Sequence, residues 1–422
     1  MSNPMRALPS PLRWFGAICL GITAFSWCFA AIYFRHTHLE WASVWSHDPS
    51  DAFGDFTHYA PLFQFFHTRE FFLSDDRFAY PAPAAVLFSW LYRMGPYQLQ
   101  IFLAGIVVSA VAACWLFCKS LIRAGLATAP AMVFTGGVLI TSWPLLFLYE
   151  RANIEVIVWL LASLGIWALL RDRPVAAAVL FGLCGSLKLY PILLLALLFS
   201  RRHLREFFLG VATFAAAMLA AFWFVGPTMN VAFHGTLNGI SGFVGNYAAT
   251  AHDELQFDHS FLGGIKMLLT QRPFHMGNFA GLTTIYIAIA GIGAALLFLL
   301  RVRRLPLINR ILFVCICMVG LPPVSYDYTL IHLCVPFALF TLAEVSVTRS
   351  GDRQPGTILA LICFGVLFTP QLFLFYGPIH LNGLLKTAAL VTLAVLLSLN
   401  PIIELDQPAL VEEADEVDAA FA

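Results

Sequence analysis

Charged residues are scarce in this chain. Only 11% of its 422 residues are Asp, Glu, Lys or Arg, and the 24 basic side chains balance the 24 acidic ones. A net charge of zero argues against the basic surface that nucleic-acid binding needs, so we expect no nucleic acid among its partners. Hydrophobic residues make up 60% of the chain, well above their share in soluble domains. The composition therefore predicts a protein that crosses a membrane several times.

The sequence also lacks the motifs of several common enzyme classes. It has no Walker loop, no GxSxG elbow and no HExxH pair. Its nine cysteines lie in apolar stretches without a CxxC pair, so we expect neither disulfides nor a zinc site. We accordingly predict no metal and no other cofactor.

Apolar stretches of about 20 residues, the length of one helical crossing, recur along the chain. The expected crossings are 12–34, 97–118, 126–147, 153–170, 206–226, 279–300, 309–322, 328–347, 357–376 and 381–402. The first is too long for the apolar core of a signal peptide, so we expect it to be retained. The predicted fold is an all-α polytopic membrane protein, with one transmembrane domain over 1–402 and a disordered, acidic cytoplasmic tail over 403–422.

One apolar segment, 174–200, is too long for an ordinary crossing and is interrupted. In "GLCGSLKLYPILLLALLFSRR", which runs from Gly182 to Arg202, Lys188 and Pro191 stand in the middle. A cation in hydrocarbon is costly and a proline breaks the helical ladder. Arginines flank the segment at both ends, and the positive-inside rule places both ends in the cytoplasm. We therefore expect a re-entrant hairpin with Lys188 at the floor of an external cavity; the alternative is one tilted, kinked helix with a snorkelling lysine.

Most of the remaining arginines and lysines also fall in loops that would be cytoplasmic if the N-terminus is. The long segments 35–80 and 227–278 are then external, and 59–72 is expected to form an amphipathic helix at the membrane surface. Ionisable side chains gather on that external side, among them Asp55, Arg151, Lys188 and His332. A carboxylate beside cations suits a reaction in which a base removes a proton and the cations hold a departing phosphate.

Four sequence stretches give the chain a family resemblance. They are "GDFTHYAPLF" with "YPAPAAVLF", "ERANIEVIVWLL", the interrupted segment above and "PPVSYDYTL". In their order and spacing they resemble glycosyltransferase family 87, whose members are polyprenyl-phosphate-mannose-dependent enzymes of the GT-C membrane superfamily. The resemblance implies a GT-C-like bundle of about 10–12 transmembrane helices. It also implies a lipid-linked sugar donor, inversion at the anomeric carbon and no nucleotide sugar.

The resemblance also assigns roles to individual residues. Asp55 matches the catalytic aspartate of the first external loop, and Lys188 matches the lysine of the broken hairpin. Arg151 and His332 are expected to help Lys188 bind the donor phosphate. Further substrate-binding residues are expected at Tyr59, Asn153, Tyr190, Tyr326 and Asp327. Here "ERAN" replaces the more usual Gly-Asn or Gly-Gln of the family, and "SYDY" replaces a motif that often contains Trp and His.

Structural roles remain open for several of these residues. Asp55 and Asp327 are also suited to cap helices, and Arg151 could pair with Glu150 or Glu155.

The sequence thus predicts an inner (plasma) membrane glycosyltransferase with its active site on the periplasmic or extracytoplasmic side. It would transfer a sugar, mannose above others, from a polyprenyl-phosphate donor to a hydroxyl of a glycolipid or glycan acceptor, with membrane lipids as its surroundings. Two alternatives stay open: a secondary transporter or flippase, and an O-antigen ligase or polymerase that uses a diphosphate donor.

Overall fold

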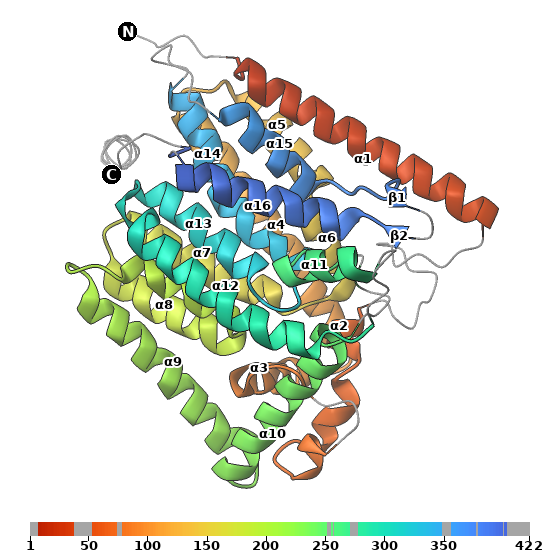
Figure 1. Cartoon of the computed structure of the whole chain (residues 1–422), viewed down its shortest axis with the longest axis vertical. Coiled ribbons are helices and arrows are strands. Elements are labelled where there is room, and N and C mark those ends of the chain that lie inside the picture. The colour runs from red at the N-terminus through yellow and green to blue at the C-terminus, as the bar shows by residue number, and fades with distance from the viewer. Residues whose placement is uncertain are drawn as a thin grey trace.

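The computed structural model describes residues 7–37, 53–73, 78–250, 255, 257–270, 277–347, 356–376, 379–399 and 401–402. Helices dominate this part of the chain (Figure 1). Six helical stretches in it are long and apolar enough to cross a membrane: Ser10–Ile32, Gln98–Arg123, Leu204–Val225, Ala280–Arg304, Asp327–Ser346 and Asn382–Leu399. The predicted all-α polytopic fold is therefore confirmed. The tail predicted at 403–422 lies outside the described residues.

The long stretches belong to helices α1 (Ser10–Thr37), α4 (Gln98–Arg123), α9 (Leu204–Val225), α12 (Ala280–Leu300), α14 (Cys334–Val347) and α16 (Asn382–Leu399). Shorter helices pack among them: α3 (Ala82–Tyr92), α7 (Glu155–Leu170), α8 (Pro174–Leu187), α11 (Phe261–Thr270), α13 (Leu307–Gly320) and α15 (Thr357–Phe368). Every residue of α13 except Arg310 is buried, so this helix lies at the centre of the apolar core.

The crossing expected at 126–147 is broken in the structure. Helix α5 (Thr128–Thr141) and helix α6 (Trp143–Arg151) meet at an angle of 49° around Ser142. Pro144 stands in the first turn of α6, where its missing N–H does no harm, whereas it would disrupt a continuous helix. If the bent pair counts as one crossing, the described residues contain up to seven.

Strands play almost no part in the described fold. Two-residue strands β1 (Phe375–Tyr376) and β2 (Ile379–His380) pair antiparallel, with Phe375 opposite His380. They lie next to the start of α16 (Figure 1). The crossing expected at 357–376 therefore ends as a helix at Phe368.

The chain reverses direction at Lys188, as the interrupted sequence predicts. Helix α8 ends at Leu187, and a 3-10 helix, η3 (Tyr190–Leu198), returns along it. A Cβ on Gly185 would lie only 3.1 Å from the backbone of Ile192, so the two arms touch. The second arm is a 3-10 helix where an α-helical half was expected, and Pro191 stands in its first turn.

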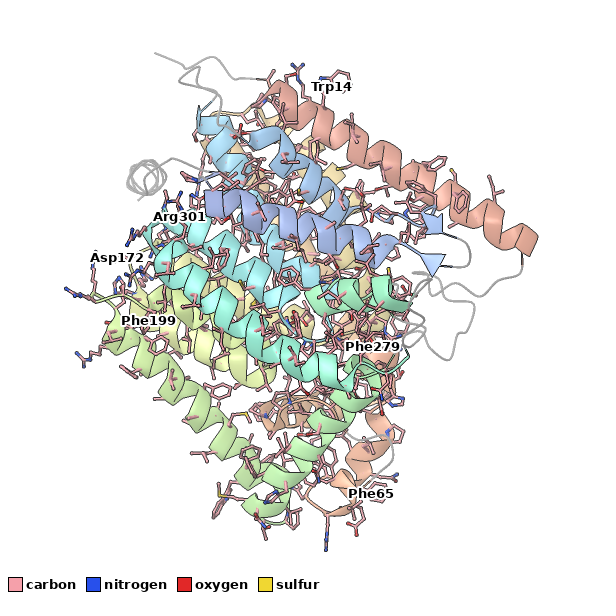
Figure 2. The ribbon with its side chains drawn as sticks, viewed as in Figure 1. Trp14, Phe65, Asp172, Phe199, Phe279 and Arg301 are labelled. Atoms are coloured by element: carbon pink, nitrogen blue, oxygen red, sulfur yellow. The ribbon has the colours of Figure 1, made fainter. Side chains whose placement is uncertain are left out.

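The two ends of this hairpin lie together. Arg202 Nη2 is 3.4 Å from Asp172 Oδ2 across its open end. Asp172, Phe199 and Arg301 appear at one end of the bundle and Phe279 at the other (Figure 2). Arg301 also donates hydrogen bonds to the carbonyls of Ser398 and Leu399, at the last turn of α16. The basic loops that the sequence places on one side thus do share one end of the molecule.

The two long loops are mostly structured where they are described. The first contains α2 (Gly54–Thr57), η1 (Ala60–Phe65) and η2 (Glu70–Phe72). The single helix expected over 59–72 is wrong, because His67 has a φ of 71° and interrupts it. The second loop contains α10 (Met229–Phe243), η4 (Val244–Ala248) and α11. Rings from η1, η2 and α3, among them Phe63, Phe71 and Phe88, pack under the first loop and hold α2 in place.

Candidate active site

Asp55 lies in α2 and is held from two sides. The backbone N–H of Phe53 donates to the carbonyl of Glu150 over 2.8 Å, which ties α2 to the end of α6. Asp55 Oδ1 accepts from Arg151 Nη2 at 2.8 Å and Nε at 3.2 Å, and Oδ2 accepts from Asn153 Nδ2 at 2.6 Å. The residue at the N-cap of α2 is Phe53, so Asp55 is not a helix cap. Its carboxylate is turned toward the "ERAN" turn.

The "ERAN" turn and the first residue of α7 carry three polar side chains of the site: Arg151, Asn153 and Glu155. Helix α6 ends at Arg151, Ala152 has a φ of 48°, and α7 begins at Glu155. Asn153 Oδ1 accepts the Glu155 N–H at 2.9 Å, so the amide caps the start of α7. The same oxygen accepts from Lys188 Nζ at 3.0 Å. Asn153 therefore connects Asp55 to Lys188 through one side chain.

Glu155 is the anchor on the other side of Lys188. Its carboxylate is fully buried, with Oε2 2.6 Å from Lys188 Nζ and Oε1 2.5 Å from His332 Nε2. The Tyr190 hydroxyl also donates to Oε1. A buried carboxylate needs such partners, because an isolated charge in the interior is very unfavourable. Glu155 thus orients three of the side chains that the sequence analysis singled out.

Aromatic rings enclose the Lys188 ammonium. Its Nζ lies 5.2 Å from the centre of the Tyr80 ring and 5.0 Å from that of Tyr328, within cation–π range. Tyr59 packs edge-on against Tyr80, and Asn153 Nδ2 is 3.3 Å from the Tyr80 hydroxyl. Burial, together with the charge of Asp55, raises the pKa of Tyr59, so this residue offers a neutral hydroxyl.

Exposure differs along this network. The side chains of Arg151 and Asp55 are 23% and 16% exposed, whereas those of Lys188 and Glu155 are 9% and 0% exposed. The Asp55–Arg151 pair therefore forms the outer, accessible end, and Glu155 forms the closed end.

Asp327 belongs to a second, fully buried cluster. Its Oδ2 accepts from Trp143 Nε1 at 2.6 Å, Asn382 Nδ2 at 2.8 Å and Lys386 Nζ at 2.6 Å. Its Oδ1 lies 3.3 Å from His259 Nδ1. These contacts tie the start of η7 (Asp327–Leu333) to α6, α16 and the second long loop. No side-chain bond from Asp327 starts η7, so it is not a cap.

The predicted residues therefore divide into two groups. The structure brings Asp55, Tyr59, Arg151, Asn153, Lys188, Tyr190 and His332 together around one site. Tyr326 and Asp327 lie beside this site. The backbone of Tyr326 pairs with that of Asp258 in an isolated β-bridge, and the centre of the Tyr326 ring is 6.1 Å from that of the Tyr328 ring. Arg151 forms an ion pair with Asp55. Glu155, which the sequence suggested as a partner of Arg151, forms an ion pair with Lys188.

The polar or aromatic participants that were not predicted from the sequence include Tyr80, Trp143, Tyr328, Asn382 and Lys386. Asn382 and Lys386 could have been predicted from the sequence, since they stand four residues apart in a largely apolar crossing. Polar side chains in such a crossing usually face the interior of the bundle and bind a partner there. Tyr80 and Tyr328 carried no such signal beyond their place within the quoted motifs "YPAPAAVLF" and "PPVSYDYTL".

A helical bundle with six or more apolar crossings and a half-buried carboxylate next to enclosed cations defines a multi-pass membrane protein with a candidate active site. The chain belongs to glycosyltransferase family 87, whose model matches residues 78–323, more than half of its length. The protein is therefore a membrane glycosyltransferase. The matched range contains the positions of Arg151, Asn153, Glu155 and Lys188, whereas Asp55 lies before it. Comparisons with curated proteins and with solved structures give no significant match.

Proposed function

We propose that this protein transfers a sugar from a polyprenyl-phosphate donor to a hydroxyl of a glycolipid or glycan, with Asp55 as the base. Mannose is the sugar we propose, from the resemblance described above. The observation that carries the proposal is the position of Asn153, which donates to Asp55 Oδ2 and accepts from Lys188 Nζ. A proton acceptor and an enclosed cation therefore stand on either side of one amide group.

The proposed reaction is a displacement with inversion at the anomeric carbon. The acceptor oxygen forms a bond to that carbon as the bond to the phosphate oxygen breaks. The hydroxyl proton passes to the Asp55 carboxylate, and the electron pair of the broken bond leaves with polyprenyl phosphate. Lys188, with Arg151 and His332 nearby, stabilises the negative charge that grows on the leaving phosphate.

The Arg151–Asp55 ion pair suggests an order of events. Both Nε and Nη2 of Arg151 donate to the same oxygen, Asp55 Oδ1. A phosphate is a better partner for that guanidinium, because two of its oxygens can accept two parallel hydrogen bonds from Arg151. Binding of the donor phosphate would therefore draw Arg151 away from Asp55 and leave Oδ1 free to take the acceptor proton.

An apolar groove next to the hairpin offers a place for the polyprenyl tail. It has a volume of about 360 Å³ and is lined by η3, α9, α12 and α13, with Ile192, Phe199, Phe207, Ala294 and Phe313 among its walls. Ile192 follows Tyr190 closely in η3, so the groove begins beside the site. Its lining also includes Phe199, which lies at the same end of the bundle as Asp172 (Figure 2).

The positive-inside rule supports the sidedness we propose. The loops that carry Arg171, Arg201 and Arg301 share one end of the bundle, which we assign to the cytoplasm. Asp55 and the "ERAN" turn would then face the extracytoplasmic side of the inner membrane.

The proposal is tested with the purified protein in lipid vesicles that contain membrane-extracted acceptor. Radiolabelled mannose is supplied in three forms: as polyprenyl monophosphate mannose, as a polyprenyl-diphosphate-linked sugar or as a nucleotide sugar. The Asp55→Asn variant is the negative control. The proposal expects labelled acceptor and polyprenyl monophosphate from the first donor alone. Transfer from the diphosphate donor would support the ligase or polymerase alternative, and transfer from the nucleotide sugar would contradict a lipid-linked donor.

A further inference from the structure

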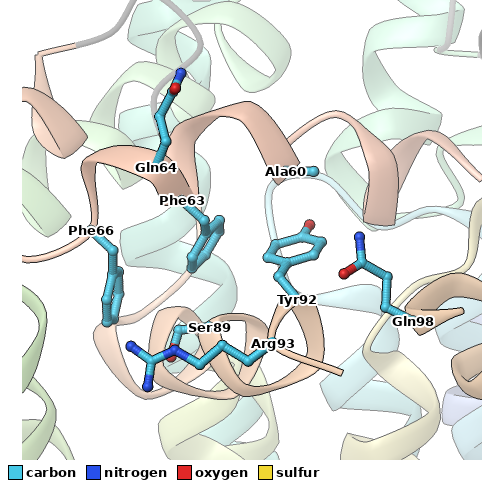
Figure 3. Close-up of a pocket in the computed structure, with 8 residues that line it drawn as sticks. All are labelled: Ala60, Phe63, Gln64, Phe66, Ser89, Tyr92, Arg93 and Gln98. Carbon is cyan, nitrogen blue, oxygen red and sulfur yellow. The ribbon is translucent and has the colours of Figure 1, made fainter. Parts of the chain in front are cut away.

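A second cavity, besides the apolar groove, lies between η1 and α3. It has a volume of about 320 Å³ and is lined by Ala60, Phe63, Gln64, Phe66, Ser89, Tyr92, Arg93 and Gln98 (Figure 3). Arg93 is the one charged residue in this lining, and none of the eight is acidic. The cavity thus combines a single cation with polar amides and hydroxyls and with aromatic rings.

This cavity is separate from the site that holds Asp55. Between the two lies a layer of packed rings from Phe56, Phe88 and Tyr59, of which Phe56 and Phe88 are 1% and 0% exposed. A sugar in the cavity would not reach the Asp55 carboxylate. The cavity is nevertheless linked to the catalytic segment, because the Tyr92 hydroxyl donates to the carbonyl of Phe56, the residue after Asp55.

The surroundings of the cavity are those of a membrane–water boundary. Trp90 and Tyr97 flank Arg93 in sequence and are 64% and 68% exposed. Exposed Trp and Tyr side chains gather at the level of the lipid head groups, where an arginine can also place its charge. Gln98, in the cavity wall, begins the long crossing helix α4, so the cavity stands at the end of a transmembrane span.

We propose that this cavity binds the head group of an anionic phospholipid of the outer leaflet. The Arg93 guanidinium would hold the phosphate by paired hydrogen bonds, which suit its planar donor set. Gln98 and Ser89 supply polar groups for the rest of the head group, and Phe63 and Phe66 cover the start of the acyl chains (Figure 3). The bound lipid would brace η1 against α3 and so help to fix the segment that carries Asp55.

The test measures lipid retention and needs no sugar transfer, so its outcome is independent of the proposed function. The full chain is reconstituted in bilayers of phosphatidylcholine and phosphatidylglycerol, extracted into mild detergent and analysed by native mass spectrometry. We expect wild type to retain phosphatidylglycerol over phosphatidylcholine and Arg93→Gln to retain about fivefold less, the loss expected for one arginine at a lipid surface. Arg69→Gln, an exposed arginine outside the cavity, is the matched control and should behave like wild type.

Gln98→Glu provides a second variant, because it places a negative charge in the cavity at nearly constant volume. It should lower retention of phosphatidylglycerol even if Arg93→Gln proves difficult to purify. Equal retention by wild type, Arg93→Gln and Gln98→Glu would overturn the proposal. So would equal retention of phosphatidylcholine and phosphatidylglycerol by the wild type.

Discussion

The carboxylate of Glu155 and the imidazole of His332 lie 2.5 Å apart, although 177 residues separate them in the chain. This contact joins the start of α7 to η7, and Lys188 completes it from the tip of the hairpin. Three segments distant in sequence are thereby fixed around one buried negative charge. The position of Lys188 beside Asn153 and Asp55 depends on that arrangement.

Breaking the Glu155–Lys188 pair should destabilise the protein strongly. Glu155→Gln or Lys188→Met leaves one buried charge without its partner, which costs about 3–5 kcal/mol in buried pairs. The double variant removes both charges and should melt at a higher temperature than either single variant. Melting temperatures of the four proteins in nanodiscs measure this coupling. Additive losses would show that the two side chains do not act as a pair.

Removing the bridging amide should reduce turnover more than substrate affinity. Asn153→Ala deletes the donor to Asp55 Oδ2 and the acceptor for Lys188 Nζ, so both groups lose their alignment. Loss of one aligned donor in an active site lowers kcat about 10²-fold or more. Initial rates over a range of donor concentrations separate the two parameters. A change confined to KM would assign Asn153 to substrate binding alone.

Asp327 should act on folding, in contrast to the substrate-binding role that its sequence suggested. Trp143, Asn382, Lys386 and His259 surround its carboxylate, and both Asp327 and Lys386 are fully buried. We expect Asp327→Asn and Lys386→Met to lower the melting temperature while the KM for the donor stays unchanged in the protein that remains folded. A raised donor KM with an unchanged melting temperature would return Asp327 to the substrate site.

Asp258 should make stability depend on pH. It lies in the second long loop, and burial raises the pKa of its carboxyl above the usual range. The folded state therefore binds this proton more tightly than the unfolded state, and stability falls as pH rises through that range. We expect the melting temperature of wild type to fall more between pH 4 and pH 7, roughly the window above an ordinary Asp pKa, than that of Asp258→Asn. Identical pH profiles for the two proteins would contradict this.

The packing of the hairpin should tolerate no side chain at Gly182. A Cβ there would lie 2.4 Å from the carbonyl oxygen of Gly210, so Gly182→Ala must push α8 away from α9. We expect a lower melting temperature and weaker transfer. Gly105→Ala in α4 is the control, because within the described residues nothing lies within 4 Å of its added Cβ and alanine favours helix. Equal effects of the two substitutions would argue against close packing at Gly182.

Much of the arrangement could be predicted from local sequence patterns. The hairpin turn at Lys188 followed from basic residues at both ends of an apolar segment, and the contact between Arg202 and Asp172 confirms it. The break at Ser142 was missed because hydropathy averages over about 20 residues and passes over a single Pro144. The pattern of residues 59–72 predicts one amphipathic helix, but the positive φ of His67 divides the segment into two short helices.

The sequence predicted which residues gather at the candidate site, but not which of them contact each other. Asp55, Arg151 and Lys188 stood out as charges in apolar surroundings with a family resemblance. Their partners are set by how α2, α7 and the hairpin pack, so Arg151 meets Asp55 across 96 residues, whereas Glu155 is only four residues away from it in the chain. Neighbours in sequence were therefore poor guides to neighbours in space.

The most direct test of the account measures donor binding and single-turnover transfer in the same preparation of Asp55→Asn. Asp172→Asn is the control, because Asp172 lies at the end of the bundle that also carries Arg301 and pairs with the exposed Arg202 (Figure 2). The account predicts that Asp55→Asn binds polyprenyl-phosphate mannose at least as tightly as wild type does, because Arg151 no longer pairs with a carboxylate, and transfers it at least about 10²-fold more slowly. Asp172→Asn should bind and transfer normally. Transfer by Asp55→Asn at the wild-type rate would contradict the claim that Asp55 is the base.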